Sequence, residues 1–239
     1  MRVPTGIKGL DKMLFGGLIK GRNILLSGPC GSGKSTLAMQ FLYNGAMQLG
    51  EPGLYITLEE TKQKFYEDMT KFGMDLKRAE KTGKFTFIGG PIASLRSYMD
   101  RVDASVKDMS AEIQEVVKEK RIKRVVIDSI NLLTMLSDNE DDRRKALAII
   151  ANTLSGLGCT SMLLSETKEG SMDLSRYGIE EFVVDGVIVL YLVRKHQVFT
   201  PGIAIRKMRG TDHDKEIRYY KITNKGIVVY PEETMFADI

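Results

Sequence analysis

The sequence predicts an α/β fold in which a mainly parallel central sheet is flanked by helices and continues into a C-terminal antiparallel extension. Three observations support this expectation. Short apolar runs alternate with amphipathic segments as far as residue 164, and four further strand-like runs follow Gly186 without helices between them. The chain has 239 residues, of which 43% are hydrophobic, so we expect one domain with a packed core over residues 1–239.

The first part of the chain alternates strands with helices. Strands are expected over residues 23–27, 54–58, 85–88, 125–127 and 161–164, and helices over residues 35–49, 61–72, 104–120 and 142–157. The last two helices carry apolar residues at helical spacing, namely Val106, Met109, Ile113 and Val116 in one, and Leu147, Ile150, Leu154 and Leu157 in the other. Thr61 is the expected N-cap of the second helix. Because such units form right-handed βαβ crossovers, the sheet should be mainly parallel and buried on both faces.

After Gly186 the pattern changes. Strands are expected over residues 187–193, 203–209, 219–223 and 227–229, and no helical segment separates them. Consecutive strands joined by short connections pair antiparallel, so these runs should extend the same sheet on its C-terminal side. The chain shows no linker, internal repeat or low-complexity segment, in keeping with a single domain.

Composition argues against several classes of protein. The 35 basic and 31 acidic residues leave a net charge of +4, too small an excess to indicate nucleic-acid binding by itself. The cysteines, Cys30 and Cys159, are not spaced as a metal site or a disulfide framework and fit a reducing cytosol. The N-terminus lacks an apolar signal segment, and no apolar run approaches the ~18 residues needed to span a bilayer. We therefore expect a cytoplasmic protein with no membrane partner.

The strongest motif is a glycine-rich loop at residues 28–35, which read G-P-C-G-S-G-K-S and are followed by Thr36. This is the G-x-x-x-x-G-K-[ST] pattern, and it stands between an expected strand and an expected helix, as a phosphate-binding P-loop requires. Glycines let the backbone wrap a phosphate, while amides and the helix N-terminus face the anion. The residues expected to bind the nucleotide are Gly28, Pro29, Cys30, Gly31, Ser32, Gly33, Lys34, Ser35 and Thr36.

Two side chains of this loop have separate expected roles. Lys34 should reach the β- and γ-phosphates, and the Ser35 hydroxyl should bind Mg²⁺. The alternative is an ordinary glycine-rich turn, which the flanking strand and helix disfavour. Cys30 is interpreted as a neutral loop residue rather than a redox switch, although a helix N-terminus can depress the pKa of a thiol.

Acidic residues follow two of the predicted strands. Asp128 follows the 125–127 strand and fits the second Mg²⁺-coordinating residue of a P-loop enzyme, the alternative being a helix N-cap. Glu59 and Glu60 follow the 54–58 strand, and one of them could orient and deprotonate an attacking water. The alternative for this pair is an acidic first turn of the helix that begins at Thr61.

A third predicted strand, at residues 161–164, ends in Ser165, Glu166 and Thr167. A polar residue here could sense the γ-phosphate and pass its state into the loop that follows. A surface turn explains the same residues nearly as well, so the pattern leaves both interpretations open.

Several segments together resemble the KaiC-like and RadA proteins of the RecA superfamily. They are R-V-P-T-G-I-x-G-L-D at 2–11 with Gly16-Gly17, G-P-C-G-S-G-K-S-T at 28–36, Y-I-T-L-E-E at 55–60, V-V-I-D-S at 125–129, R-Y-G-I-E-E-F-V-V-D-G-V at 176–187 and K-M-R-G-T-D-H-D-K at 207–215. The resemblance runs from about residue 2 to residue 230, and the conjunction of these segments is specific to KaiC-like proteins.

This resemblance implies a RecA-like P-loop NTPase core that binds ATP with Mg²⁺, and a homohexameric ring with ATP at the subunit interfaces. The residues it implies as phosphate and Mg²⁺ ligands are Lys34, Ser35 and Thr36. Glu59 and Glu60 correspond to the catalytic glutamate pair of the family, and Asp128 corresponds to its Walker B acid. Adenine specificity follows from the resemblance alone.

In KaiC-like proteins the K-x-R-G strand supplies cations to a neighbouring subunit's site. Lys207 and Arg209 are two apart on an expected strand, so both should point to one face, with Arg206 and Met208 on the other. Two cations on one face fit the γ-phosphate bound by a neighbouring subunit, in the way that arginine fingers do. Without the resemblance, the residues themselves favour a solvent-exposed strand face. Further expected contacts to the neighbour's nucleotide are His213 and Lys215.

The sequence also departs from the circadian KaiC pattern. Circadian KaiC carries two such domains and phosphorylates a Ser–Thr pair in the second, where this chain reads Glu181-Phe182. Neither residue accepts phosphate, so autophosphorylation of that kind is not expected. The clock-partner tail of KaiC has only residues 231–239 as its counterpart here.

The preferred function is a slow ATPase whose hydrolysis drives or times a conformational change in a homo-oligomeric ring, in a regulatory or signalling role with an unidentified protein partner. One alternative is a nucleic-acid-binding recombination accessory, as for RadA relatives. The acidic run S-D-N-E-D-D at 137–142 disfavours it, although Arg143, Arg144 and Lys145 follow directly. Another alternative is a nucleotide-gated scaffold that barely hydrolyses ATP.

Overall fold

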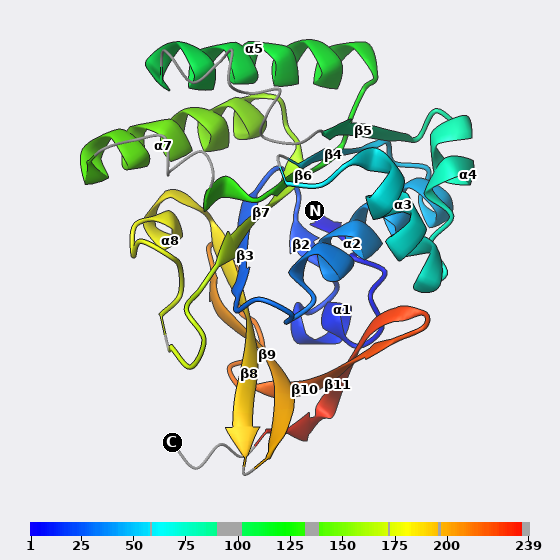
Figure 1. The fold of residues 1–239 in the computed structure, drawn as a ribbon, viewed down its shortest axis with the longest axis vertical. Coiled ribbons are helices and arrows are strands. Elements are labelled where there is room, and N and C mark those ends of the chain that lie inside the picture. Colours follow the sequence, from blue (N-terminus) through cyan, green and yellow to red (C-terminus); the bar gives the residue numbers. More distant parts are fainter. Residues whose placement is uncertain (58, 90–101, 132–138, 172, 196, 236–239) are drawn as a thin grey trace.

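The computed structural model of this protein describes residues 1–57, 59–89, 102–131, 139–171, 173–195 and 197–235. Within these residues, nine strands form one sheet in the order β11-β10-β9-β8-β3-β7-β6-β4-β5 (Figure 1). Its strands are β3 (Asn23–Gly28), β4 (Gly53–Thr57), β5 (Phe85–Gly89), β6 (Arg124–Asp128), β7 (Thr160–Glu166), β8 (Gly186–Lys195), β9 (Val198–Met208), β10 (Arg218–Thr223) and β11 (Gly226–Thr234). A separate small sheet pairs β1 (Arg2–Val3) with β2 (Leu18–Ile19).

The strands from β3 to β7 pair in parallel, and β8 pairs in parallel with β3. Every residue of β3 is buried, as is all of β6 except its last residue, Asp128. Strands covered on both faces are mainly apolar, which is why the centres of β3 and β6, residues 24–26 and 125–127, lack the alternation of a half-exposed strand. The predicted mainly parallel α/β sheet is confirmed.

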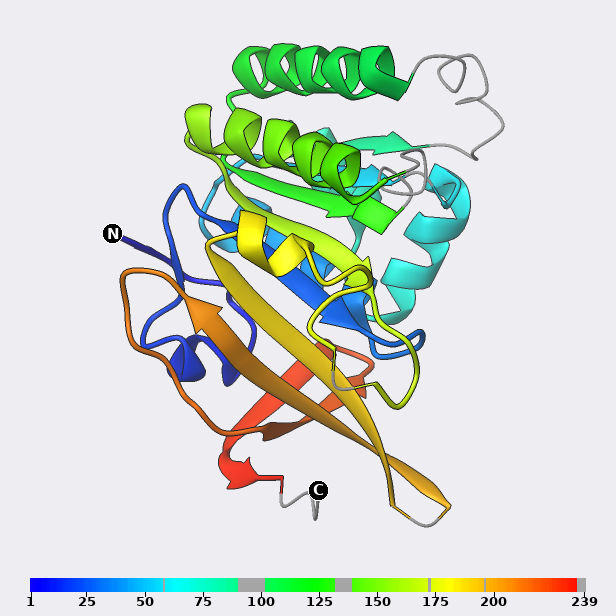
Figure 2. The same ribbon diagram turned by 90° about the vertical axis from the view of Figure 1, so that its left-hand side faces the viewer.

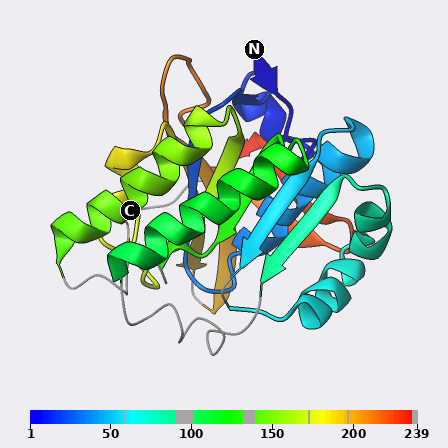
Figure 3. The same ribbon diagram turned by 90° about the horizontal axis from the view of Figure 1, so that it is seen from above.

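Helices cover both faces of the sheet (Figures 1 and 3). They are α1 (Leu10–Met13), α2 (Lys34–Gln48), α3 (Lys62–Lys71), α4 (Leu76–Lys81), α5 (Val102–Glu119), α7 (Glu140–Gly156) and α8 (Glu180–Val183). The core divides accordingly. Phe41 and Phe65, from α2 and α3, belong to one buried cluster, whereas Ile113 and Ile150, from α5 and α7, belong to a second cluster on the opposite face.

The C-terminal strands form the predicted antiparallel extension. β8 and β9 make a long hairpin that projects away from the body of the molecule (Figure 2). The β10–β11 hairpin returns to the P-loop region, where the buried Tyr220 hydroxyl donates a 2.5 Å hydrogen bond to the Ser32 carbonyl. Gln40 of α2 bonds both the N–H and the carbonyl of Ile227 in β11. The extension is therefore hydrogen-bonded to both the P-loop and α2.

Short elements are absent from the sequence-based expectations. α1, α4, α8, β1 and β2 each span six residues or fewer, too few for a periodic pattern to develop. Thr61 is the N-cap residue of α3, but its side chain makes no capping hydrogen bond. None of the helices in the described part of the chain has the length and apolarity required to cross a bilayer.

The acidic run predicted to disfavour nucleic acid begins a helix. Asn139 caps α7 by accepting a 2.9 Å hydrogen bond from the Asp142 amide, and Glu140, Asp141 and Asp142 form the first turn. Acids in this position stabilise the positive end of the helix dipole. Residues 137 and 138 of the run lie outside the described residues.

Candidate nucleotide-binding site

Glycines shape the loop between β3 and α2. Gly33, the N-cap of α2, has φ 89°, a left-handed conformation that costs energy for residues with side chains. Gly28 permits a close approach instead, since a Cβ built there would lie 2.6 Å from the Leu190 carbonyl oxygen. The Pro29 carbonyl accepts from the Ser32 hydroxyl at 2.8 Å and closes the loop. The loop thus leads into a helix N-terminus, whose unpaired amides favour an anion.

The P-loop residues differ in their exposure. Cys30 and Gly31 are exposed, and Gly33 and Ser35 are partly exposed. The buried members are Gly28, Pro29, Ser32, Lys34 and Thr36. The P-loop is therefore exposed to solvent at residues 30 and 31, and the rest of the loop is partly or fully buried.

Lys34 is a buried cation at the centre of this loop. Its Nζ donates hydrogen bonds to the Gly28 and Pro29 carbonyls, each 3.0 Å away, and lies 3.9 Å from Glu166. Desolvation lowers the pKa of Lys34, while the charges of Glu166 and Asp128 partly oppose that effect. A desolvated ammonium group interacts more strongly with a phosphate than an exposed one does.

Asp128 and Ser35 meet across the end of the sheet. The Ser35 hydroxyl donates a 2.7 Å hydrogen bond to Asp128 Oδ2, and the Tyr55 hydroxyl donates to the same oxygen. Burial raises the pKa of Asp128, although these two donors and Lys34 act in the opposite direction. Two oxygen-bearing side chains are thereby brought together at the start of α2, as the sequence predicted for Ser35 and Asp128. Tyr55 was not predicted as a member of the site.

Glu59 and Glu60 lie beside this pair, just after β4. Ser129, which follows Asp128, donates a 2.8 Å hydrogen bond from its hydroxyl to Glu59 Oε1. The negative charge of Glu60 acts to raise the pKa of both Asp128 and Tyr55, so Glu60 is close to them as well. α3 begins at Lys62 with no acid in its first turn. The alternative explanation of the two glutamates as a helix start is therefore wrong.

The end of β7 closes the other side of the site. Glu166 approaches Lys34, and the Thr167 amide donates a 3.0 Å hydrogen bond to the Gly28 carbonyl. Ser165 is buried, and its hydroxyl contacts Asn131 at 3.0 Å and Glu180 at 3.3 Å. A surface turn does not describe these residues. Neither Asn131 nor Glu180 carried a sequence signal that would have placed it here.

Lys207 and Arg209 lie away from the P-loop of their own chain. Lys207 pairs with Val187 near the start of β8, and its Nζ donates to the Glu181 and Val184 carbonyls at 2.6 and 2.7 Å. Arg209 is 3.9 Å from Asp185, and its amide bonds the Asp185 carbonyl. Both side chains are thus at the amino end of β3, opposite its P-loop end.

The expected alternation along this strand is broken by a β-bulge. Val187 pairs with Lys207 but Ile188 pairs with Ile205, which leaves Arg206 as an extra residue. The positive charge of Arg206 acts to lower the pKa of Tyr191, and Tyr191 lies on the α5–α7 face of the sheet. The α8 carbonyls that accept hydrogen bonds from Lys207 lie on the same face. Arg206 is therefore not on the face opposite Lys207. Two adjacent residues on one face are the usual result of a bulge.

The remaining residues expected to contact a neighbour lie in the loop after β9. His213 is buried, with its Nδ1 2.8 Å from the Asp214 carbonyl oxygen. Lys215 forms an exposed ion pair with Asp212 at 2.7 Å. The Asp214 amide bonds the Met13 carbonyl, so this loop is attached to α1. The structure does not bring either residue to the P-loop of the same chain.

Comparisons with known proteins agree with this geometry. A protein-family profile described as "ATPase: KaiC" matches residues 3–234. A UPF0273 protein of Thermotoga maritima is 36% identical over 97% of both chains, and the circadian clock oscillator protein KaiC of Synechococcus elongatus is 33% identical over 96% of this chain and 44% of its own length. A crystal structure of a KaiC-like protein from Pyrococcus horikoshii superimposes with a TM-score of 0.85 at 38% identity, covering 97% of this chain and 99% of that one.

Proposed function

Because this chain belongs to the KaiC family of ATPases, we propose that it hydrolyses ATP slowly at a P-loop site that a neighbouring copy completes within a homohexameric ring. It is an ATP-binding ATPase of the KaiC and RecA type. The proposed role is regulatory, with hydrolysis timing a conformational change that a protein partner detects. The observation that carries this proposal is the convergence of Ser35, Asp128 and Glu59, through the 2.7 Å Ser35–Asp128 and 2.8 Å Ser129–Glu59 hydrogen bonds.

The side chains at this site fit Mg²⁺ bound together with ATP. Ser35 and Asp128 offer adjacent oxygen ligands, and no group of three or more His, Cys, Asp or Glu side chains among the described residues could hold a metal by itself. Mg²⁺ commonly takes one or two protein ligands and completes its shell with waters and substrate phosphates. When bound, the ion neutralises charge on the β- and γ-phosphates.

The protein groups divide the remaining work. Lys34 exchanges its two carbonyl acceptors for phosphate oxygens and holds the transferred group in place. Glu59 accepts the proton of the attacking water, and the Ser129 hydroxyl fixes the carboxylate that receives it. Glu60 supports this base as the second acid of the pair. Asp128 accepts from Ser35 and Tyr55, which keeps its free oxygen directed to the metal position.

The placement of the cations supports the proposed ring. Lys207 and Arg209 are at the end of β3 opposite the P-loop, so within one chain they do not reach a bound γ-phosphate. A neighbouring copy that presents this end of its sheet would supply both cations, with His213 and Lys215 behind them. Such a site is complete only in the assembled state, so hydrolysis and assembly depend on each other.

Autophosphorylation is not part of this proposal. The residues at the position of the circadian phosphorylation pair are Glu181, which accepts a hydrogen bond from Ser175, and Phe182, which is 64% exposed. Neither has a hydroxyl group. Nucleic-acid binding gains no support either, because the described part of the acidic run forms the first turn of α7.

Substitution of the glutamate pair tests the catalytic assignment. Glu59→Gln should lower kcat by about 100-fold while ATP affinity remains, since a general base contributes to the transition state rather than to binding. Glu60→Gln should have a smaller effect of the same kind. Glu112→Gln, on the exposed face of α5, is the matched control. An unchanged rate in both site variants would favour a nucleotide-gated scaffold.

Assembly is tested separately. The molecular mass should increase when ATP and Mg²⁺ are added, and specific activity should rise with protein concentration as sites become complete. Lys34→Ala should abolish both the binding and the mass change, whereas Lys225→Ala, in the exposed β10–β11 turn, should not. Constant specific activity across the monomer-to-ring transition would rule out a site shared between copies.

A further inference from the structure

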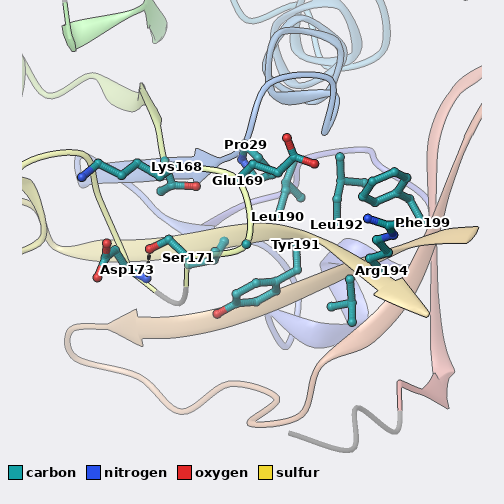
Figure 4. A pocket seen from close by; sticks show the side chains of 14 residues that line it. Pro29, Lys168, Glu169, Ser171, Asp173, Leu190, Tyr191, Leu192, Arg194 and Phe199 are labelled. Carbon is teal, nitrogen blue, oxygen red and sulfur yellow. Dashed lines mark hydrogen bonds between the residues drawn. The ribbon is translucent and has the colours of Figure 1, made fainter. Parts of the chain in front are cut away.

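The two ends of β8 have different surroundings. Residues 189–194 line a pocket of about 330 Å³ together with Pro29 of the P-loop and the loop after β7 (Figure 4). At its other end, β8 begins beside the amino end of β3 and the carboxyl end of β9. Asp185, which precedes β8, and Arg209, which follows β9, are therefore neighbours at the end of the sheet opposite the P-loop, and neither lines that pocket.

Asp185 is fixed by the strand next to it. Its amide donates a 2.9 Å hydrogen bond to the Asn23 carbonyl, and its Oδ2 accepts a 3.2 Å hydrogen bond from the Asn23 amide. Only 13% of the side chain is exposed. Asp185 is therefore a fixed acceptor at the start of β3, and its other oxygen, Oδ1, faces the cations around it.

Two arginines share this second oxygen unequally. Arg22 Nη1 donates a 2.9 Å hydrogen bond to Asp185 Oδ1, whereas Arg209 Nη1 lies 3.9 Å from the same atom. In the part of the chain that the structure describes, the Arg209 guanidinium makes no hydrogen bond, and its side chain is 54% exposed. Arg22 therefore satisfies Asp185, while Arg209 is held only loosely.

Arg209 has an anchored backbone and a free side chain. Its amide donates a 2.9 Å hydrogen bond to the Asp185 carbonyl, which fixes the position from which the side chain extends. Lys207 differs, because its Nζ donates to the Glu181 and Val184 carbonyls. Arg209 can turn toward a neighbouring copy by moving its side chain alone, and it then gives up only an exposed ion pair, which contributes little.

We propose that Arg22 is a positioning residue that keeps Arg209 available to a neighbouring subunit, because it neutralises the acid that would bind Arg209 within its own chain. This inference rests on the proposed action of Arg209 on the neighbour's nucleotide. Without Arg22, the arginine left beside Asp185 is Arg209, and their 3.9 Å separation should close to a hydrogen bond. Arg209 is then divided between its own Asp185 and the neighbour's γ-phosphate.

Arg22→Gln tests the proposal. Its kcat should fall about threefold, since an exposed ion pair shifts an equilibrium by about fivefold at most. Arg22→Lys keeps the positive charge and should restore most of the wild-type kcat. Lys20→Gln removes a positive charge from the same connection between β2 and β3, at an exposed residue, and is the matched control. All variants are compared at protein, ATP and Mg²⁺ concentrations that give the same molecular mass, so that assembly does not contribute.

A second substitution distinguishes release of Arg209 from a structural role of Arg22. Asp185→Asn removes the competing charge, and its side-chain oxygen can still accept from the Asn23 amide. The double variant Arg22→Gln/Asp185→Asn should therefore regain the kcat that Arg22→Gln loses, whereas a structural role predicts no recovery. The ratio of wild-type to Arg22→Gln kcat should also shrink between about 50 mM and about 500 mM NaCl, because salt screens the Arg209–Asp185 pair.

A measurement without nucleotide separates this inference from the proposed function. In nucleotide-free Arg22→Gln, the order parameter of the Arg209 Nε–H bond from ¹⁵N relaxation should rise as Asp185 captures the side chain, and in Lys20→Gln it should not. An unchanged order parameter, or a double variant no more active than Arg22→Gln, overturns the proposal while the ring remains possible. A raised order parameter with unchanged kcat contradicts the action of Arg209 on a neighbour, and the role of Arg22 fails with it.

Discussion

The Ser165 hydroxyl lies 3.3 Å from Glu180 Oε1, and this contact connects the end of β7 to the short helix α8. Glu180 is 1% exposed and also accepts from the amides of Tyr177 and Ile179. The next carbonyl, that of Glu181, accepts from Lys207. Hydrogen bonds and the short backbone of α8 therefore connect the strand end beside the P-loop to Lys207, the cation proposed to serve a neighbouring copy.

Removal of the Glu180 carboxylate should weaken this connection. Glu180→Ala leaves the Tyr177 and Ile179 amides without their side-chain acceptor, while the Ser165 hydroxyl keeps Asn131, so we expect a loss of about 2 kcal/mol in the free energy of unfolding. Urea denaturation measures the loss, and Glu115→Ala on the exposed side of α5 is the control. A loss no larger than that of the control would mean that the Glu180 contacts contribute little.

Asp128→Asn should stabilise the nucleotide-free protein while it abolishes hydrolysis. Burial raises the pKa of Asp128 in the folded state. The native protein therefore holds this proton more tightly than the unfolded chain, and the resulting stability is present below pH about 4 and is lost as pH rises through the folded-state pKa. Asn carries no charge to desolvate, so the variant should gain about 1 kcal/mol at pH 7, as other substitutions at strained active sites do.

The pH dependence provides the control for this prediction. The gain of Asp128→Asn should disappear at pH 3, where the wild-type carboxyl is protonated as well. Asp142 has the opposite shift, because hydrogen bonds from Asn139 and Lys145 lower its pKa. The stability that ionised Asp142 contributes is present above the pKa of the unfolded chain and is lost as pH falls through the folded-state pKa. Asp142→Asn should therefore lower the Tm at pH 7, and a gain in that variant would contradict the argument.

Arg124 and Glu51 form a second stability test. Arg124 is fully buried; its Nε donates a 2.7 Å hydrogen bond to Glu51, and its NH1 bonds the Phe41 carbonyl of α2. Glu51→Ala leaves this guanidinium without a counter-charge, so we expect about 2 kcal/mol of destabilisation in urea unfolding. This loss is small for a buried ion pair because Glu51 itself is partly exposed. Glu119→Ala breaks an exposed pair with Lys120 and should cost nothing measurable.

The features that sequence patterns predicted are local ones. The P-loop, Asp128 and the two glutamates each adjoin a strand whose apolar run is recognisable within a few residues, and parallel strands bring their carboxyl ends to one edge. The contact of Tyr220 with Ser32 joins residues 188 apart, and that of Tyr55 with Asp128 joins residues 73 apart. Such pairs depend on the strand order of the folded sheet, which no spacing rule specifies.

The bulge at Arg206 illustrates the same limit. A period of two correctly predicted a strand here, but one extra residue shifts the faces, and nothing in R-K-M-R-G indicates where the extra residue enters. The two glutamates show the converse. Their alternative explanation as a helix start could be rejected only once α3 was seen to begin at Lys62. Sequence patterns thus indicated the chemical groups of the site, and the register between strands decided their neighbours.

A mixing experiment tests whether Arg209 acts on a neighbouring copy. Glu59→Gln removes the proposed base from its own site, and Arg209→Ala removes the proposed cation from the adjacent site, so each variant alone should be inactive. In a ring of both, a site is restored where an Arg209→Ala subunit, with Glu59 intact, lies next to a Glu59→Gln subunit that still carries Arg209. Random assembly of equal amounts restores about one quarter of the sites, so the mixture should regain about a quarter of wild-type activity. Mixtures of Glu59→Gln with Glu60→Gln should show no more than the average of the two separate activities, because both changes lie on the same side of the interface. If the Arg209→Ala mixture is equally inactive although mixed rings form, Arg209 acts within its own subunit or not at all.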